Sequence, residues 1–175
     1  MSRSENTSKL IQAALFTAIT AVGAFISVPL PFTPIPVTLA TLAAMLAGTL
    51  LGPRYGSLSQ IVYLLLGAVG LPVFHNFTGG LGILTGPTGG FLLGYVAMAL
   101  ISGVAVTSKR GNLSCTLAIA TVTCYIVGTA WFMATTGSGA SAAFVSCIAP
   151  FIPGDIIKII AAVILTERLK LYIRR

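Results

Sequence analysis

Charge is scarce in this sequence, and acidic charge is nearly absent. Charged residues make up 7% of the 175 positions, and only 3 of them are aspartate or glutamate. Soluble domains carry about 25% charged residues. Because 56% of the residues are hydrophobic, a soluble fold of this length could not bury them, and lipid is the more favourable surrounding. The composition predicts an all-α integral membrane protein that forms a single domain over residues 1–175.

The residue types of common active sites and metal sites are also sparse. The chain has one histidine, His75, and one aspartate, Asp155, which excludes a two-aspartate protease. It contains no GxSxG, HExxH or Walker motif. Cys115, Cys124 and Cys147 are far apart, form no CxxC pair and are expected to pack as small hydrophobic residues. We therefore predict no enzymatic activity, no metal, no cofactor and no ATP hydrolysis by the chain itself.

What the sequence has instead is long apolar runs. A membrane-spanning helix needs about 20 mostly apolar residues. The second and third runs are short and joined only by GPRYG, so they are expected to be tilted or to cross only partly. The last run is interrupted near Pro150 and Pro153. We predict six membrane-spanning segments, with approximate bounds 10–28, 37–52, 56–71, 89–106, 113–135 and 143–171.

The basic residues indicate how these segments are oriented. Of the 10 lysines and arginines, all but Lys158 fall at the termini or in alternate connections, such as Lys109 and Arg110 between the fourth and fifth segments. Basic residues concentrate on the cytoplasmic side of membrane proteins. Both termini are therefore predicted to be cytoplasmic, in a multi-pass protein of the plasma membrane. The basic excess is explained by topology, and no nucleic-acid partner is predicted.

Three helix-breaking segments then share the external side. VPLPFTPIP, residues 28–36, carries four prolines and is expected to be an irregular connection. Residues 72–88 are glycine-rich and are expected to be loop, and residues 136–142 form a turn of small residues. The glycine-rich loop is either a tight external turn or the lining of a small-molecule site. Asn76 in this loop is a candidate ligand contact, and His75 a weaker one.

Asp155 and Lys158 are opposite charges inside the last apolar run. A charge in a membrane span costs about 2.5–3.5 kcal/mol on insertion scales. Their i, i+3 spacing places them on one side of a helix. They are either a mutually neutralising pair that packs inside the bundle or a polar patch that faces an aqueous pocket. The second interpretation is favoured, because ionisable groups within the membrane usually mark a substrate or ion path.

Small residues on the first segment form strips that suit close helix packing. Ala14 and Ala18 are four residues apart, as are Ala13, Thr17 and Ala21. Such strips allow two helices to approach closely. The sequence leaves open whether the partner helix belongs to this chain or to another protein.

Four stretches carry a resemblance to a known family: PIPVTLATLAAMLAGTLLGPRYG, GLPVF, GGLGILTGPTGGFLLGY and FIPGDIIK. In this order they resemble the BioY family, the biotin-binding S component of energy-coupling-factor (ECF) vitamin transporters, over nearly the whole chain. Two positions depart from the family pattern. Ala40 stands where many members have glutamine, and Phe91 where many have tyrosine, and each change removes one possible polar contact.

The resemblance implies a six-helix S-component bundle that captures biotin from outside. Uptake would be driven by a transmembrane coupling protein and two cytoplasmic ATPase subunits, with Ala14 and Ala18 at the docking surface. A self-sufficient oligomeric carrier and an S component for another vitamin remain alternatives. The candidate substrate-binding residues are Asn76, Gly79, Gly80, Gly86, Thr88, Gly89, Tyr95, Asp155 and Lys158.

Overall fold

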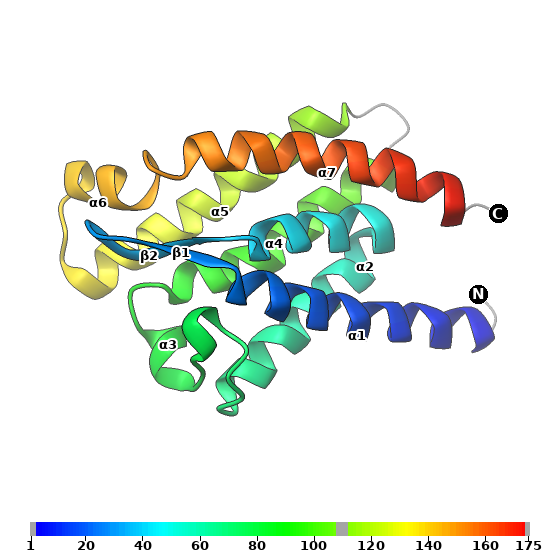
Figure 1. Cartoon of the computed structure of the whole chain (residues 1–175), viewed down its shortest axis with the longest axis horizontal. Coiled ribbons are helices and arrows are strands. Elements are labelled where there is room, and N and C mark those ends of the chain that lie inside the picture. The colour runs from blue at the N-terminus through cyan, green and yellow to red at the C-terminus, as the bar shows by residue number, and fades with distance from the viewer. Residues whose placement is uncertain (1–2, 108–111, 174–175) are drawn as a thin grey trace.

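The computed structural model describes residues 3–107 and 112–173. Long helices run side by side between two ends of the molecule (Figure 1). In chain order the elements are α1 (Arg3–Phe25), β1 (Ser27–Leu30), β2 (Thr33–Thr38), α2 (Ala40–Ala68), a 3-10 turn η1 (His75–Phe77), α3 (Leu81–Thr85), α4 (Gly89–Thr107), α5 (Leu113–Thr136), α6 (Ala140–Cys147) and α7 (Ile152–Ile173).

The irregular elements gather at one end of the helices. The β1–β2 hairpin, α3 and α6 lie together at the left of Figure 1, while α1 begins and α7 ends at the right. The segments 28–36, 72–88 and 136–142, which the sequence assigns to one side, thus share one end. Lys109, Arg110, Arg174 and Arg175, on which part of the orientation argument depends, lie outside the described residues.

The proline-rich segment is a β-hairpin, which corrects both the expected irregular connection and the all-α class. β1 and β2 pair antiparallel, with Ser27 opposite Thr38 and Leu30 opposite Thr33. The pairing is irregular between Val28 and Leu30. Proline is compatible with a strand that has a free edge, and both strands of a two-stranded sheet are edge strands. β2 thereby becomes a rigid element beside the helices.

The second and third apolar segments form one bent helix, α2, and not two separate helices. Gly52 is its non-helical residue, with φ 81° and ψ 175°, and Pro53 follows it. Proline lacks the backbone N–H that would continue the helix. The expected interruption at GPRYG is therefore present as a kink.

Glycines let α4 approach both sides of this kink. A Cβ on Gly48 would lie 2.2 Å from the carbonyl oxygen of Ala99, and one on Gly103 would lie 2.3 Å from the nitrogen of Pro53. Both obstacles are backbone atoms, which cannot move without displacing a helix. The contact of α2 with α4 therefore depends on the absence of side chains.

We expect Gly48→Val to lower the free energy of unfolding in detergent by about 1–3 kcal/mol, since overpacking in a close contact costs that much. Thermal unfolding measures the change. Gly82→Val in α3 is the matched control, because a Cβ there meets nothing within 4 Å. Equal unfolding temperatures for the two variants would contradict the close α2–α4 contact.

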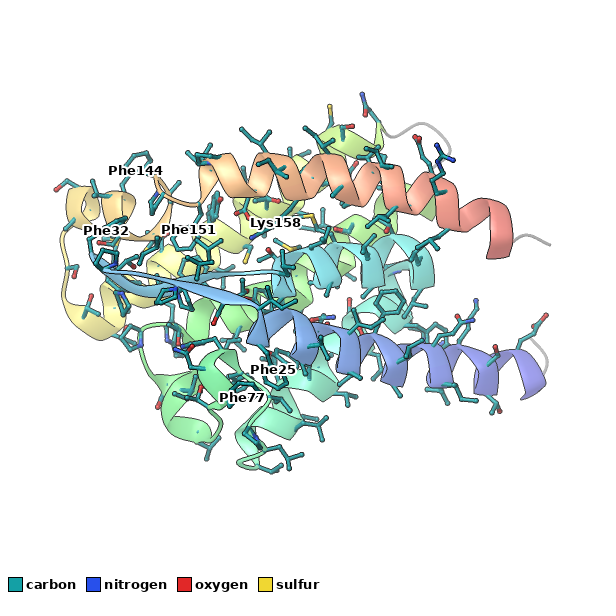
Figure 2. The ribbon with its side chains drawn as sticks, viewed as in Figure 1. Phe25, Phe32, Phe77, Phe144, Phe151 and Lys158 are labelled. Carbon is teal, nitrogen blue, oxygen red and sulfur yellow. The ribbon has the colours of Figure 1, made fainter. Side chains whose placement is uncertain are left out.

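The glycine-rich segment is partly ordered as helix, which corrects the expected continuous loop. It contains η1 and the short helix α3. Asn76 and Phe77 both have positive φ, 54° and 55°. The ring of Phe77 stacks on that of Phe25 at a centroid distance of 4.3 Å, as Figure 2 shows at the end of α1. The stacking ties the segment to the start of the hairpin.

The number of membrane spans differs from the prediction of six. Within the described residues, α1 from Glu5 and α5 are long and apolar enough to cross a membrane. The α6–α7 pair, bent by 48°, is a third candidate if it counts as one span. The apolar part of α4, Gly89–Ala105, is shorter. At about 1.5 Å per residue it is shorter than a hydrocarbon core of about 30 Å.

Candidate functional site

Asp155 and Lys158 form an ion pair inside the bundle. Their atoms Oδ1 and Nζ are 2.8 Å apart. The two residues are only 5% and 6% exposed. Pro153, in the first turn of α7, is tolerated because the first backbone N–H groups of a helix have no intrahelical acceptor. Asp155 is also in that first turn, where the helix dipole stabilises negative charge.

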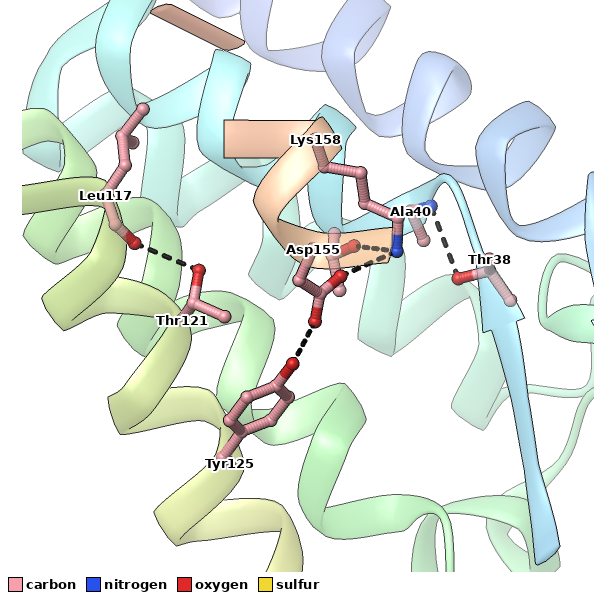
Figure 3. A network of polar contacts seen from close by, with 8 residues as sticks. Thr38, Ala40, Leu117, Thr121, Tyr125, Asp155 and Lys158 are labelled. Atoms are coloured by element: carbon pink, nitrogen blue, oxygen red, sulfur yellow. Dashed lines mark hydrogen bonds and ion pairs between the residues drawn. The ribbon is translucent and has the colours of Figure 1, made fainter. Parts of the chain in front are cut away.

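Two other helices complete the polar cluster. Nζ of Lys158 donates to Oγ1 of Thr41, at the start of α2, over 3.0 Å. The hydroxyl of Tyr125, on α5, donates to Oδ2 of Asp155 (Figure 3). Each carboxylate oxygen therefore has its own donor. A buried ion pair stabilises a fold only when such additional hydrogen bonds are present.

The ion pair lines a cavity that has two lobes. The inner lobe, of about 390 Å³, is lined by Asp155 and Lys158, and the other lobe encloses about 330 Å³. Both volumes count space that is open to solvent. They are close to the lower end of the usual range for small-molecule sites, about 300–1,000 Å³. The lobes are continuous, since they share the lining residues Ile35, Pro36, Thr38, Phe91 and Tyr95.

The two lobes differ in chemistry. The inner lobe is charged and contains Thr41, Tyr125, Asp155 and Lys158. The other lobe has neutral polar groups, from Tyr63, His75 and Thr88. The wall that both share is mainly apolar. The arrangement suits an elongated molecule that is polar at both ends and apolar between them.

Tyr63 offers the neutral lobe an unused hydrogen-bonding group. The residue is fully buried, and within the described part of the chain its hydroxyl has no hydrogen-bond partner. Leaving a buried hydroxyl unpaired costs about 1–3 kcal/mol. A ligand that accepts or donates here removes that cost.

His75 is half-buried at the same lobe. Burial lowers the pKa of its imidazole, because the charged form loses hydration. The ordinary pKa is about 6.5. His75 is therefore neutral at pH 7 and offers one donor and one acceptor nitrogen.

The structure brings four of the predicted site residues to one cavity. Asp155 and Lys158 line the charged lobe, Thr88 the neutral lobe, and Tyr95 both. The hydroxyl groups of Tyr95 and Thr38 are hydrogen-bonded. Polar groups from α7, α4 and the connection before α4 thus converge on one space.

Asn76 has a different position. It is exposed, and its Oδ1 accepts a hydrogen bond from the hydroxyl of Ser27 over 3.2 Å. It does not belong to the cavity lining, whereas the neighbouring His75 does. The sequence favoured Asn76 over His75, and the turn at η1 reverses that order.

The four glycines named as site residues are also absent from the cavity lining that the structure describes: Gly79, Gly80, Gly86 and Gly89. Their positions indicate a packing role. A Cβ on Gly89 would lie 1.7 Å from the carbonyl oxygen of Leu84. The carbonyl of Gly86 accepts a hydrogen bond from Nε1 of Trp131 over 3.0 Å, which attaches the segment to α5. These contacts hold Thr88 and Phe91 at the cavity.

The sequence analysis missed Thr41, Tyr63 and Tyr125. Thr41 follows Ala40 in the PVTLAT stretch, so that motif contained a signal for it. Tyr125 is far from every quoted motif, and only the packing of α5 against α7 brings it to Asp155. Of the two departures from the family pattern, Phe91 lies in the cavity wall, whereas Ala40 is buried beside it.

The small residues of α1 point in two directions. Ala13, Thr17 and Ala21 are buried, and the hydroxyl of Thr17 donates to the carbonyl of Ser59 on α2 over 2.8 Å. This strip packs within the chain. Ala14 and Ala18 are exposed and lie on the other side of the helix.

Comparison with known proteins gives consistent relatives. The sequence model described as BioY family matches residues 1–175. The probable biotin transporter BioY of Pyrococcus horikoshii is 40% identical, over 90% of this chain and 93% of its own. The biotin transporter BioY of Thermotoga maritima is 38% identical, over 93% of this chain and 95% of its own.

Solved structures agree with these sequence relatives. The S-component for biotin from an ECF-type ABC transporter superposes with a TM-score of 0.88 at 30% identity, covering 97% of this chain and 94% of its own. The S component of a bacterial ECF transporter superposes with a TM-score of 0.69 at 25% identity, covering 97% and 99%. These relatives are membrane transport proteins and not enzymes. With its apolar helices, its S-component fold and a family match over its whole length, the chain belongs to the BioY family.

Proposed function

We propose that the chain is the substrate-binding membrane component of an ECF-type transporter and that it captures biotin. The observation that carries the proposal is the two-lobed cavity, with a dry ion pair at one end and neutral polar groups at the other. Biotin has a ureido group, an apolar thioether ring and a valerate carboxylate. Its polar groups are separated by apolar carbon, as are those of the cavity.

The ion pair is complementary to the ureido group. A ureido presents N–H donors beside a carbonyl acceptor. Asp155 and Lys158 present an acceptor and a donor side by side, 2.8 Å apart. An ammonium has three donors, and those of Lys158 that face Asp155 and Thr41 leave one for a ligand oxygen. The pair is neutral as a whole, so it suits a neutral group better than a free carboxylate.

The valerate chain then extends along the shared apolar wall toward the neutral lobe. Its carboxylate would reach donors such as the hydroxyls of Tyr63 and Thr88, and the imidazole of His75. The glycine-rich segment shapes this lobe and, with Asn76, forms its outer surroundings. Gly79, Gly80, Gly86 and Gly89 act in this proposal through the position of that segment.

The membrane arrangement completes the proposal. We place the single domain, residues 1–175, across the plasma membrane in six crossings, with both termini in the cytoplasm. Support comes from the common end at which α1 begins and α7 ends (Figure 1) and from the basic residues of the sequence. Ala14 and Ala18 would contact a transmembrane coupling protein, which joins the chain to two ATPase subunits.

The test is calorimetric titration of the purified protein in detergent with biotin, riboflavin and thiamine. We expect stoichiometric binding of biotin alone. Tight binding of another vitamin would keep the S-component role and change the substrate. No binding by a folded sample would contradict the capture proposal. Biotin uptake into vesicles that contain the protein alone, without ATP, would instead favour a self-sufficient carrier.

A further inference from the structure

Tyr125 lies where the ligand cavity meets a second hollow. A groove of about 570 Å³ runs between α5 and the α6–α7 pair on the outside of the bundle. Its lining is almost entirely apolar and includes Val122, Ile152 and Ile156, which are 53%, 42% and 53% exposed. The side chains that line both the groove and the charged lobe are Tyr125 and Asp155. Their contact therefore forms a partition between the two spaces.

The partition holds the carboxylate from two sides. Lys158 contacts Oδ1 of Asp155 from the next turn of the same helix, and Tyr125 donates to Oδ2 from α5 (Figure 3). Thr41 holds Lys158 from α2. The apolar lining on the groove side offers few donors that could replace the hydroxyl of Tyr125.

We propose that Tyr125 is a positioning residue for ligand capture. Its hydroxyl keeps Asp155 turned toward the cavity, and its ring separates the charged lobe from a groove that faces membrane hydrocarbon. The identity of the ligand in this inference rests on the proposed function, whereas the control of the Asp155 carboxylate does not.

The expected consequence follows from the hydrogen bond. Without the hydroxyl, Oδ2 of Asp155 is left facing an apolar surface, where an unsatisfied charged oxygen is unfavourable. The carboxylate then turns or recruits water, and the acceptor is no longer in place for a ligand. Hydrogen bonds to charged groups contribute enough that the loss is expected to weaken binding about tenfold.

Tyr125→Phe tests the inference, because it removes the hydroxyl and keeps the ring. Thr123→Val is the matched control on α5, since it removes a hydroxyl that contacts only the carbonyl of Ile119 one turn earlier. Two quantities are measured for each protein: biotin affinity by calorimetry, and the carboxyl resonance of ¹³C-labelled aspartate by NMR. Asp155 is the sole aspartate of the sequence, so that resonance reports on a single site.

We expect Tyr125→Phe to bind biotin about tenfold more weakly and to shift the resonance in the ligand-free protein. Thr123→Val should change neither. Replacement of Tyr125 by 4-aminophenylalanine, which restores a donor, should recover both. An unchanged resonance in Tyr125→Phe, a shift without loss of affinity, or no recovery by 4-aminophenylalanine would each overturn the proposal. If the unsubstituted protein fails to bind biotin, the capture proposal fails, and the resonance still decides whether Tyr125 positions Asp155.

Discussion

Replacing Asp155 by asparagine is expected to weaken biotin binding by at least about 100-fold. Removing one partner of a buried ion pair costs about 3–5 kcal/mol, because the remaining charge is left without compensation. Here that charge is the ammonium of Lys158, which is 6% exposed and whose other contact is the neutral Thr41. The variant also loses the charged acceptor for the ureido. Calorimetric titration measures the affinity directly.

Two controls separate binding from folding. Glu167→Gln makes the same change from carboxylate to amide on an exposed part of α7, and it should bind as the unsubstituted protein does. The double substitution Asp155→Leu with Lys158→Leu replaces the pair by apolar side chains, which is often neutral or stabilising. We expect it to unfold near the original temperature and to bind no biotin.

The double variant decides between the two interpretations of the pair. If it folds and still binds biotin with full affinity, Asp155 and Lys158 are a packing feature and the charged lobe is not the ligand site. Full affinity in Asp155→Asn would lead to the same conclusion.

Tryptophan at Ala14 and Ala18 is expected to lower biotin uptake by at least about tenfold, the effect of losing about 1.4 kcal/mol of association with a partner. Both alanines are exposed on a helix whose opposite strip is already occupied by α2. A flat strip of small residues permits close approach of another helix, and an indole prevents it. The measurement is ATP-driven uptake in cells that contain the coupling protein and both ATPases.

The same substitutions should leave biotin affinity in detergent unchanged, since Ala14 and Ala18 are absent from the cavity lining. Ala130→Trp is the matched control, because Ala130 is an exposed alanine on another long helix, α5. Normal uptake by the Ala14 and Ala18 variants, or an equal defect in Ala130→Trp, would remove α1 as the docking surface.

Several features could be read from the sequence because they depend on neighbouring residues. Spacing i, i+3 on one helix was enough to pair Asp155 with Lys158, and the structure confirms the contact. The interruption at Gly52 and Pro53 follows from backbone chemistry and is present as a kink. The apolar composition indicated membrane helices, and small residues every four positions indicated close packing on α1.

Other predictions failed because local chemistry left several outcomes open. Proline excludes regular helix from residues 28–36, but it does not choose between an irregular loop and the hairpin that pairs Ser27 with Thr38. Glycine permits both close packing and close approach to a ligand. Only the tertiary contacts of Gly86 and Gly89 show that packing accounts for these two positions.

By itself the sequence determined the apolar character, the family and the charged pair, since these follow from composition, motif order and helical spacing. The tertiary structure decided which side chains surround that pair. Thr41, Tyr125 and Asp155 are separated by 84 and 30 positions along the chain, and they meet because α2, α5 and α7 pack together. The positive φ of Asn76 likewise turned its side chain toward Ser27 and left His75 at the cavity. Long-range packing depends on the fit of whole helix surfaces, which no short stretch of residues encodes.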